Sequence, residues 1–323
     1  MTVAAIAAAL AAHPSILGKL DIAKATRALG LTGNSTGRPG DDAAALPRPE
    51  GGWDLFAAEA FIPAFVADDP WFAGWCGVMV NLSDIAAMGG TATAIADMIW
   101  APDAASAAPV LQGLQAASAA YDVPVIGGHT NLNAPALNLS VAVTGRARAL
   151  ISSFAARPDD LLIAAIDLRG AWRPRFDNWF AAADAPAARL RGDLALLPEL
   201  AEAGLLRAGK DISQGGIAGT SLMLAECSGC GFEIDLDRLP MPPGTDAARW
   251  LRAFPSFGFL LSVQMPDAKE VCARFADRGI AAAVIGRATA GASVDLVQGA
   301  ERATFWDWQQ RPYLGLGQQV AHA

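Results

Sequence analysis

Four short segments of the sequence place glycine beside acidic or other polar side chains in apolar surroundings. The first is Gly40-Asp41-Asp42, which follows a glycine-containing stretch from residue 32 to residue 39. Carboxylate oxygens are hard ligands, and Mg²⁺ takes one or two of them from a protein while it keeps several waters. Asp41 and Asp42 are therefore candidate magnesium ligands, although Gly-Asp-Asp is equally typical of a surface turn.

The second segment, Asn81-Leu-Ser-Asp84, lies inside an apolar run from residue 76 to residue 99. A carboxylate in such a run is costly to bury without a partner, so we expect Asn81 and Asp84 to bind a ligand. In the alternative interpretation, Ser83 or Asp84 is the N-cap of a short helix that Gly89-Gly90 ends.

The third segment runs from Pro124 to Asn131 and contains Gly127-Gly128-His129-Thr130. We expect an apolar strand that ends in the two glycines and the polar residues His129, Thr130 and Asn131, and glycines at a strand end let the backbone approach a phosphate closely. His129 and Thr130 would then contact the phosphate directly. A structural histidine in a turn remains the alternative.

The fourth segment contains Asp211, Ser213, Gly215 and Gly216 just before a predicted helix. The free backbone N–H groups at a helix start, together with the positive end of its dipole, suit an anion. Asp211 adds a further candidate metal ligand. The alternative is an ordinary helix start capped by Ser213.

In this order, the four segments resemble the AIR synthase-like (PurM-like) superfamily of ATP-binding enzymes. GDDAA and NLSDIAAMGG are similar to its thiamine-monophosphate kinase members, and GGHT is similar to its selenophosphate synthetases. DISQGGIAGTSLMLAE resembles the motif of the second domain across the wider superfamily. The likeness extends from about residue 38 to residue 290.

The resemblance implies an α/β (α+β) fold with two domains. The N-terminal sheet would form a barrel across a homodimer, and the C-terminal domain would be an α/β sandwich. The cofactors would be ATP and Mg²⁺, with Asp41, Asp42, Asp84 and Asp211 gathering the metal around the triphosphate. The expected nucleotide contacts are Asn81, Gly127, Gly128, His129, Thr130, Ser213, Gly215 and Gly216.

The function that this resemblance implies is transfer of a phosphoryl group to an amide, carbonyl or phosphate oxygen of a small molecule, or activation of that oxygen. One alternative is a thiamine-monophosphate kinase, but His129 replaces an acidic residue of those kinases and Ala58-Glu59 replaces a Thr-Asp pair. Selenium activation is disfavoured because no cysteine precedes Cys76, and Lys19 lies in a predicted helix. The remaining alternatives are a non-catalytic, nucleotide-binding regulatory subunit and a purely structural protein.

Several elements can be predicted around these segments. Alternating apolar residues predict a strand over residues 137–143, and apolar runs predict strands over 161–166 and 280–285. We expect helices near the N-terminus, over 101–120 and over 268–275, the last with a capping box formed by Asp267 and Glu270. The predicted domains are residues 1–148 and 149–323.

Composition limits the remaining possibilities. Hydrophobic residues make up 53% of the 323 residues and charged residues 17%, which predicts a globular protein with a sizeable core. The net charge of −8, without a run of five or more Lys and Arg, argues against nucleic-acid and membrane partners. Four unevenly spaced cysteines favour a reducing, cytoplasmic location, and Cys227-Ser-Gly-Cys230 is a weak candidate for redox chemistry or half of a zinc site.

Overall fold

The structure is a computed structural model that describes residues 1–173 and 175–317. The chain forms two compact units. Unit 1 contains Met1–Asp42, Ile151–Ala183 and the described part of Leu200–Ala323, and unit 2 contains Ala43–Leu150 and Asp184–Glu199. The predicted boundary between residues 148 and 149 stays a prediction.

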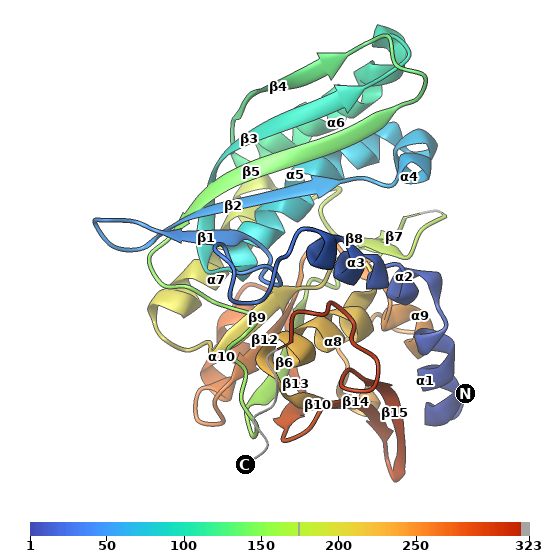
Figure 1. Ribbon diagram of the computed structural model, residues 1–323, viewed down its shortest axis with the longest axis vertical. Helices are drawn as coiled ribbons and strands as arrows, with labels where there is room; N and C mark the ends of the chain where they lie inside the picture. The colour runs from blue at the N-terminus through green and yellow to red at the C-terminus, as the bar shows by residue number, and fades with distance from the viewer. Residues whose placement is uncertain (174, 318–323) are drawn as a thin grey trace. The chain divides into compact units, whose positions relative to one another are not determined.

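Unit 2 is built on a five-stranded sheet in the order β1-β2-β5-β3-β4. Its pairs are antiparallel except for β3 and β4, which are parallel and joined through helix α6, as a parallel crossover requires. Helices α5 and α6 lie on one face of this sheet (Figure 1). The elements are β1 (Ala44–Pro47), β2 (Trp53–Ala60), α4 (Pro63–Asp68), α5 (Pro70–Ala87), β3 (Gly90–Trp100), α6 (Ala104–Tyr121), β4 (Val125–Asn131) and β5 (Asn138–Ala147), followed in unit 2 by most of α7 (Ala187–Glu202).

Helix α5 is the longest buried element of unit 2. Asp69 caps it by accepting a hydrogen bond from the Phe72 N–H at 3.3 Å, and Pro70 fits the first turn, where no N–H is needed. The helix packs closely on α6, because a Cβ on Gly74 would lie 2.0 Å from the Val110 carbonyl oxygen. The start at Pro70 places Ser83 and Asp84 inside the helix, so the alternative interpretation, an N-cap at one of these residues, is wrong.

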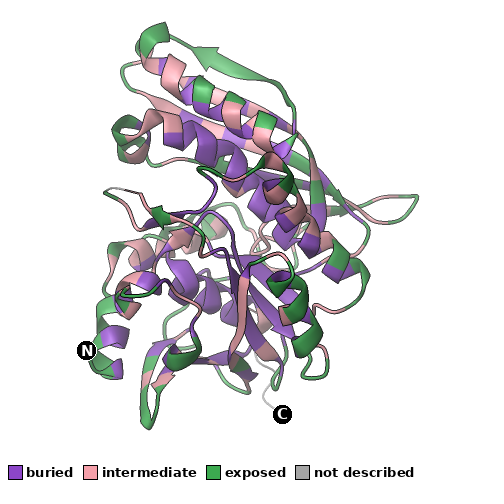
Figure 2. Cartoon of the chain, turned by 180° about the vertical axis from the view of Figure 1, so that it is seen from behind, coloured by how far each residue is buried: buried purple, intermediate pink, exposed green. Residues whose placement is uncertain are grey.

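Unit 1 is built on a seven-stranded sheet in the order β15-β14-β10-β13-β6-β12-β9. Side chains alternate along β6: Leu162, Ala164 and Ile166 share a core with helix α8, whereas the residues between them face the side contacted by α10. Both faces of β6 and of its neighbour β12 are therefore buried (Figure 2). The elements are β6 (Leu161–Ile166), β9 (Ala208–Asp211), α8 (Gly216–Ser228), β10 (Gly231–Asp235), β12 (Gly258–Val263), α10 (Ala268–Ala276), β13 (Ala281–Thr289), β14 (Ser293–Gln298) and β15 (Glu301–Asp307).

The N-terminal helices belong to this unit as well. Helix α1 (Val3–Ala11) contacts β14 and β15, and α2 (Pro14–Leu17) is tied to the chain far downstream because the Tyr313 hydroxyl donates to the Ile16 carbonyl at 2.9 Å. Helix α3 (Leu20–Ala28) follows. The other elements are η1 (Leu236–Arg238), α9 (Ala247–Trp250) and a three-stranded sheet of β7 (Ala171–Trp172), β8 (Asn178–Phe180) and β11 (Phe254–Pro255).

Most predicted elements are confirmed. The strand predicted over 161–166 is β6, those over 137–143 and 280–285 fall largely within β5 and β13, and the predicted helices correspond to α1, α6 and α10. The capping box is wrong: Asp267 makes no capping hydrogen bond, and Glu270 instead pairs with Arg274 at 2.9 Å. Among the described residues, no single helix is long and apolar enough to cross a bilayer, although the bent pair Val3–Ala11 and Pro14–Ala28 meets the length and composition test.

Candidate functional site

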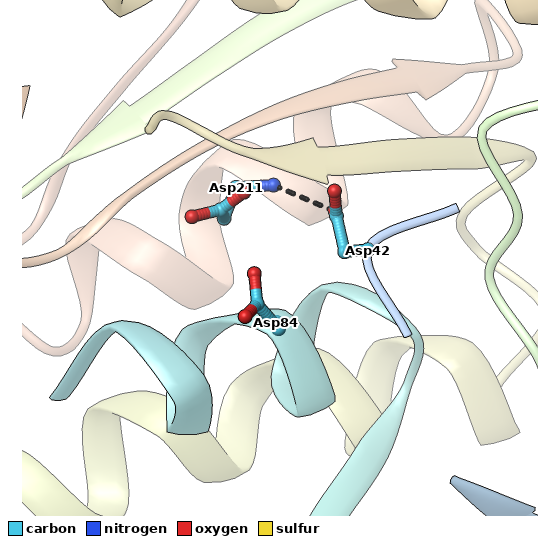
Figure 3. A group of neighbouring side chains, drawn as sticks. All are labelled: Asp42, Asp84 and Asp211. Carbon is cyan, nitrogen blue, oxygen red and sulfur yellow. Dashed lines mark hydrogen bonds between the residues drawn. The ribbon is translucent and has the colours of Figure 1, made fainter. Parts of the chain in front are cut away.

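Two of the predicted metal ligands, Asp42 and Asp211, lie together in unit 1. Asp211 is the last residue of strand β9, and its backbone N–H donates to Asp42 Oδ2 at 3.1 Å (Figure 3). One carboxylate oxygen of each residue lies within 4.8 Å of the other. Residues 169 positions apart in the sequence are thus brought together where β9 ends.

Lys210 holds the Asp42 carboxylate from the other side. Its Nζ donates to Asp42 Oδ1 and also to the Gly40 carbonyl, the latter at 3.2 Å. Both side chains are only 5% exposed. Burial by itself lowers the pKa of the Lys210 ammonium, but the Asp42 carboxylate, helped by Cys227 and Asp211, raises it above its ordinary value. Lys210 therefore stays charged and offsets one of the carboxylates.

Asp41 has a different environment from its neighbour. Its Oδ1 accepts the Ser153 N–H at 2.6 Å and the Ser152 hydroxyl at 3.0 Å. Burial raises the pKa of Asp41, and these hydrogen bonds oppose the shift only in part. The side chain ties the loop to residues 152–153, whereas Asp42 faces Lys210 and Asp211.

The loop that carries the two aspartates depends on Gly40. Its φ of 113° is a conformation that side chains rarely adopt, and an added Cβ would lie 2.9 Å from both Cys227 Sγ and Phe154 Cζ. A larger residue would push the loop away from these groups. Gly40 therefore fixes the approach of Asp41 and Asp42 to strand β9.

The start of helix α8 lies immediately after Asp211. Gly215 and Gly216 have φ values of 101° and 64°, and a Cβ on Gly216 would collide with the Arg252 backbone at 2.4 Å. Gly215 is the N-cap residue and no side chain caps the helix, so the alternative interpretation, a cap at Ser213, is wrong. Two of the first N–H groups donate to backbone carbonyls instead, Gly216 to Ser213 and Ala218 to Leu251, each at 2.9 Å.

Lys19 was not expected at this site. Its Nζ lies 3.5 Å from Ser213 Oγ, a contact between residues 194 positions apart in the sequence. Lys19 is the N-cap residue of α3, so the local sequence pattern predicted only that it lies in a helix and did not indicate a binding role. The chain has four lysines, and the residues around Lys19 contain no motif that would identify it as a binding residue.

Unit 2 carries Asn81 and Asp84 on helix α5, where a spacing of three residues puts them on one face. Asn81 Nδ2 donates to the Gly77 carbonyl at 2.8 Å, but its Oδ1 is buried and has no hydrogen-bond partner among the described residues. A buried acceptor without a partner is rare and calls for an explanation such as a bound ligand. Asp84 is also buried, and Figure 3 shows its carboxylate on this helix.

The remaining predicted contacts, Gly127, Gly128, His129 and Thr130, lie on β4, an exposed strand at the sheet edge. The strand runs from Val125 to Asn131 and so contains the two glycines and the polar residues after them, as predicted. Gly128 is required by packing, because a Cβ there would lie 1.8 Å from the Asp97 carbonyl oxygen. The His129 ring faces Trp100, with centroids 6.1 Å apart.

The two cysteines of the C-x-x-C segment do not favour redox chemistry. Cys227 and Cys230 are free and buried. Burial raises the pKa of the Cys227 thiol well above its usual range, and it raises the pKa of Cys230 to about 12. Because the thiolate is the reactive and metal-binding form, both residues are unreactive core thiols.

Comparison with known families covers most of the chain. Residues 40–147 match the model of the AIR synthase related protein N-terminal domain, and residues 179–298 match that of the C-terminal domain. This chain belongs to the AIR synthase related protein family. The superfamily predicted from the four segments is therefore confirmed.

Curated relatives of this AIR synthase related protein agree with the assignment. An uncharacterized protein of Synechocystis sp. is 47% identical over 279 residues, which is 86% of each chain. A thiamine-monophosphate kinase of Halobacterium salinarum is 30% identical over 278 residues, which is 82% of this chain and 92% of the kinase.

Solved structures support the fold. The structure of Thermotoga maritima PurL complexed with ATP matches 85% of this chain with a TM-score of 0.72 and 17% identity. This chain spans 46% of that PurL chain. The likeness confirms the mixed α/β, two-domain PurM-like fold, while the barrel across a homodimer stays a prediction.

Proposed function

We propose that this AIR synthase related protein binds Mg-ATP and uses it to phosphorylate or activate an oxygen atom of a small-molecule acceptor. The observation that carries the proposal is the buried arrangement of Asp42, Lys210 and Asp211 at the end of strand β9. Two comparisons support the proposal. Thiamine-monophosphate kinases are among the relatives of this chain, and PurL, a structural neighbour, is known in complex with ATP.

The residues present fit a magnesium ion. Two oxygens bound to one Mg²⁺ at about 2.0–2.1 Å are at most about 4.2 Å apart. The Asp42 and Asp211 oxygens lie within 4.8 Å, so a small side-chain rotation brings both into range. Each Asp42 oxygen accepts one hydrogen bond and retains a lone pair for a metal.

We propose Asp84 as the third metal ligand and Asn81 as its neighbour at the bound nucleotide. The buried Asn81 Oδ1, which lacks a partner among the described residues, supports a ligand on this face of α5. Asp41, by contrast, is assigned an anchoring role because its oxygens accept hydrogen bonds from Ser152 and Ser153. Of the two adjacent aspartates, Asp42 is the proposed ligand.

Bound magnesium would supply the charge neutralisation on which phosphoryl transfer depends. The protein's own groups would position the phosphates. The Ile217 N–H at the start of α8 and the Ser213 hydroxyl offer hydrogen bonds, and Lys19 offers a cation that is not committed to a carboxylate among the described residues. Lys210 cannot serve in this way, because Asp42 already holds its ammonium.

The homodimer is part of the same proposal. Phe56 on β2 and Ile126 on β4 are 51% and 71% exposed, and they offer apolar surface on the sheet of unit 2 to a second copy. If sedimentation experiments at micromolar concentration showed only monomers, the proposed homodimer would be contradicted.

Release of ADP tests the proposed activity. We expect magnesium-dependent ADP formation that rises when one of a panel of acceptors is added, the panel comprising amides, carboxylates, thiamine monophosphate and other phosphate esters. Stimulation by thiamine monophosphate alone would favour the kinase alternative. Tight ATP binding with no ADP release for any acceptor would favour a regulatory subunit, and failure of Mg-ATP to raise the melting temperature would contradict nucleotide binding altogether.

Replacement of Lys19 by alanine tests the phosphate-positioning role. We expect turnover to fall about tenfold to a hundredfold, because a charge-assisted contact contributes about 1.5–3 kcal/mol. Lys19→Arg should retain more activity than Lys19→Ala. Lys24→Ala is the matched control, since Lys24 lies in helix α3, which begins just after Lys19, but pairs with the exposed Asp21. Equal rates for Lys19→Ala and the control would exclude Lys19 from the site.

A further inference from the structure

A cavity of about 600 Å³ lies within unit 1 and shares no lining residue with the site described above. Its walls come from β7, β8 and the segment that leads into α9. This volume is in the range of pockets that hold small organic ligands. We name it the Trp172 pocket; the residues that matter below are Trp172, Trp179, Pro242, Thr245, Asp246 and Arg249.

The aromatic wall of the Trp172 pocket is held rigidly. The Trp172 and Trp179 rings meet at 83° with centroids 5.5 Å apart, and Trp250 packs behind them perpendicular to both. The Trp179 Nε1–H donates to the Asp167 carbonyl at 3.1 Å, and the Trp250 Nε1–H donates to the Pro240 carbonyl at 2.9 Å. Two indoles therefore form a fixed corner, to which Pro242 adds apolar surface.

The polar groups of the pocket balance in charge. The Arg249 guanidinium carbon lies 3.8 Å from the Trp172 ring centroid, and Arg249 Nε donates to Asp177 Oδ1 at 2.9 Å. Asp246 accepts the Arg249 N–H as the cap of α9. Asp246 and Arg249 are the two charged residues that line the cavity, and their formal charges cancel.

This balance disfavours a phosphate or other anion as the occupant. Asp177 pairs with both Arg249 and Arg252, at 2.9 and 2.8 Å, and these two arginines together with Asp177 and Asp246 carry no net charge to attract an anion. A purely apolar occupant is also disfavoured. Thr245 and Trp172 line the pocket, and the Thr245 hydroxyl and the Trp172 indole N–H make no hydrogen bond among the described residues, so a purely apolar ligand would give them no partner.

We propose that the Trp172 pocket binds an uncharged, planar heteroaromatic ring. Aromatic rings prefer offset-stacked or edge-to-face contacts at about 4.5–7 Å between centroids, and a planar ligand extends the perpendicular array of tryptophans in this way. Ring heteroatoms or an attached amide would pair with Thr245 and with the second oxygen of Asp246. The inference does not depend on the proposed ATP chemistry.

Nicotinamide is a suitable probe because it is planar, uncharged and carries both a ring nitrogen and an amide. In ¹⁵N-labelled full-length protein without nucleotide, we expect it to shift the Trp172 indole N–H resonance in a saturable manner, with half-saturation in the range of roughly 1–10 mM. Glucose, which can also stack on indoles, should leave that resonance unchanged at the same concentration. No shift with nicotinamide, or a shift with glucose alone, would overturn the proposal.

Ala171 offers a variant that does not disturb the core. It lines the pocket and is exposed, so Ala171→Leu should fill the entrance while the protein stays folded. We expect nicotinamide binding to weaken at least about tenfold, with the other indole resonances unchanged. Trp100→Phe, in unit 2, is the control and should bind nicotinamide as the unmodified protein does. Unaltered binding by Ala171→Leu would place the nicotinamide elsewhere and contradict the assignment.

Discussion

Replacing Asp211 with asparagine is expected to lower magnesium-dependent ATP turnover about 10²- to 10³-fold. The change removes one of the negative charges proposed to hold the metal, and losses of about 3–4 kcal/mol in transition-state stabilisation correspond to this factor. The hydrogen bond to Asp42 is donated by the backbone of residue 211, so the substitution leaves that contact in place. Steady-state ADP release with saturating magnesium measures the effect.

The control for Asp211→Asn is Asp277→Asn, which removes a carboxylate from an exposed position at the end of α10. Melting temperatures of both variants should stay close to that of the unmodified protein when ATP is absent. Turnover by Asp211→Asn within about twofold of the control would show that Asp211 does not hold the metal.

Replacing Lys210 with methionine is expected to reduce the free energy of unfolding by about 3–5 kcal/mol. The Asp42 and Lys210 side chains are each 5% exposed, and removal of one partner leaves a buried carboxylate without its counter-charge. Methionine fills a similar volume, so the loss reports on charge rather than on packing. Urea denaturation of the full chain measures it.

A second variant distinguishes lost charge pairing from lost shape. The double substitution Asp42→Asn with Lys210→Met removes both charges and should recover part of the stability lost by Lys210→Met alone. Lys24→Met is the surface control, because its ion pair with Asp21 is exposed and should contribute under about 1 kcal/mol. If Lys210→Met and Lys24→Met had equal urea-denaturation midpoints, the buried ion pair would not contribute the expected stability.

The sequence was sufficient to predict the family, most central elements and the candidate residues around Asp42 and Asp211. Strand β6 could be predicted because five of its six residues are buried and apolar, and such runs favour a strand buried on both faces. The order of the four polar segments added information that no single segment carries. Those features depend on local pattern or on motif order, and both are visible in the sequence.

Other features depend on contacts between distant residues and could not be predicted. The different roles of Asp41 and Asp42 arise from Ser153 on one side and Lys210 on the other, more than 100 positions away in each case. Lys19 lies beside Ser213, 194 positions away, and it follows helix α2, which Tyr313 contacts through its hydrogen bond to Ile16. The capping rule also failed at Ser83 and Asp84, because a stronger helix start lies upstream. Asp69 and Pro70 begin helix α5 well before these residues.

Asp42, Asp84 and Asp211 are proposed to bind one divalent cation together with ATP. Crystals grown with Mn²⁺ and a non-hydrolysable ATP analogue would reveal this site, because anomalous scattering locates the manganese. We expect a manganese ion within about 2.0–2.4 Å of a carboxylate oxygen from each of the three residues, next to the analogue's phosphates. A cation bound elsewhere, or an ordered nucleotide with Asp84 and Asp211 far from its phosphates, would rule out this metal site.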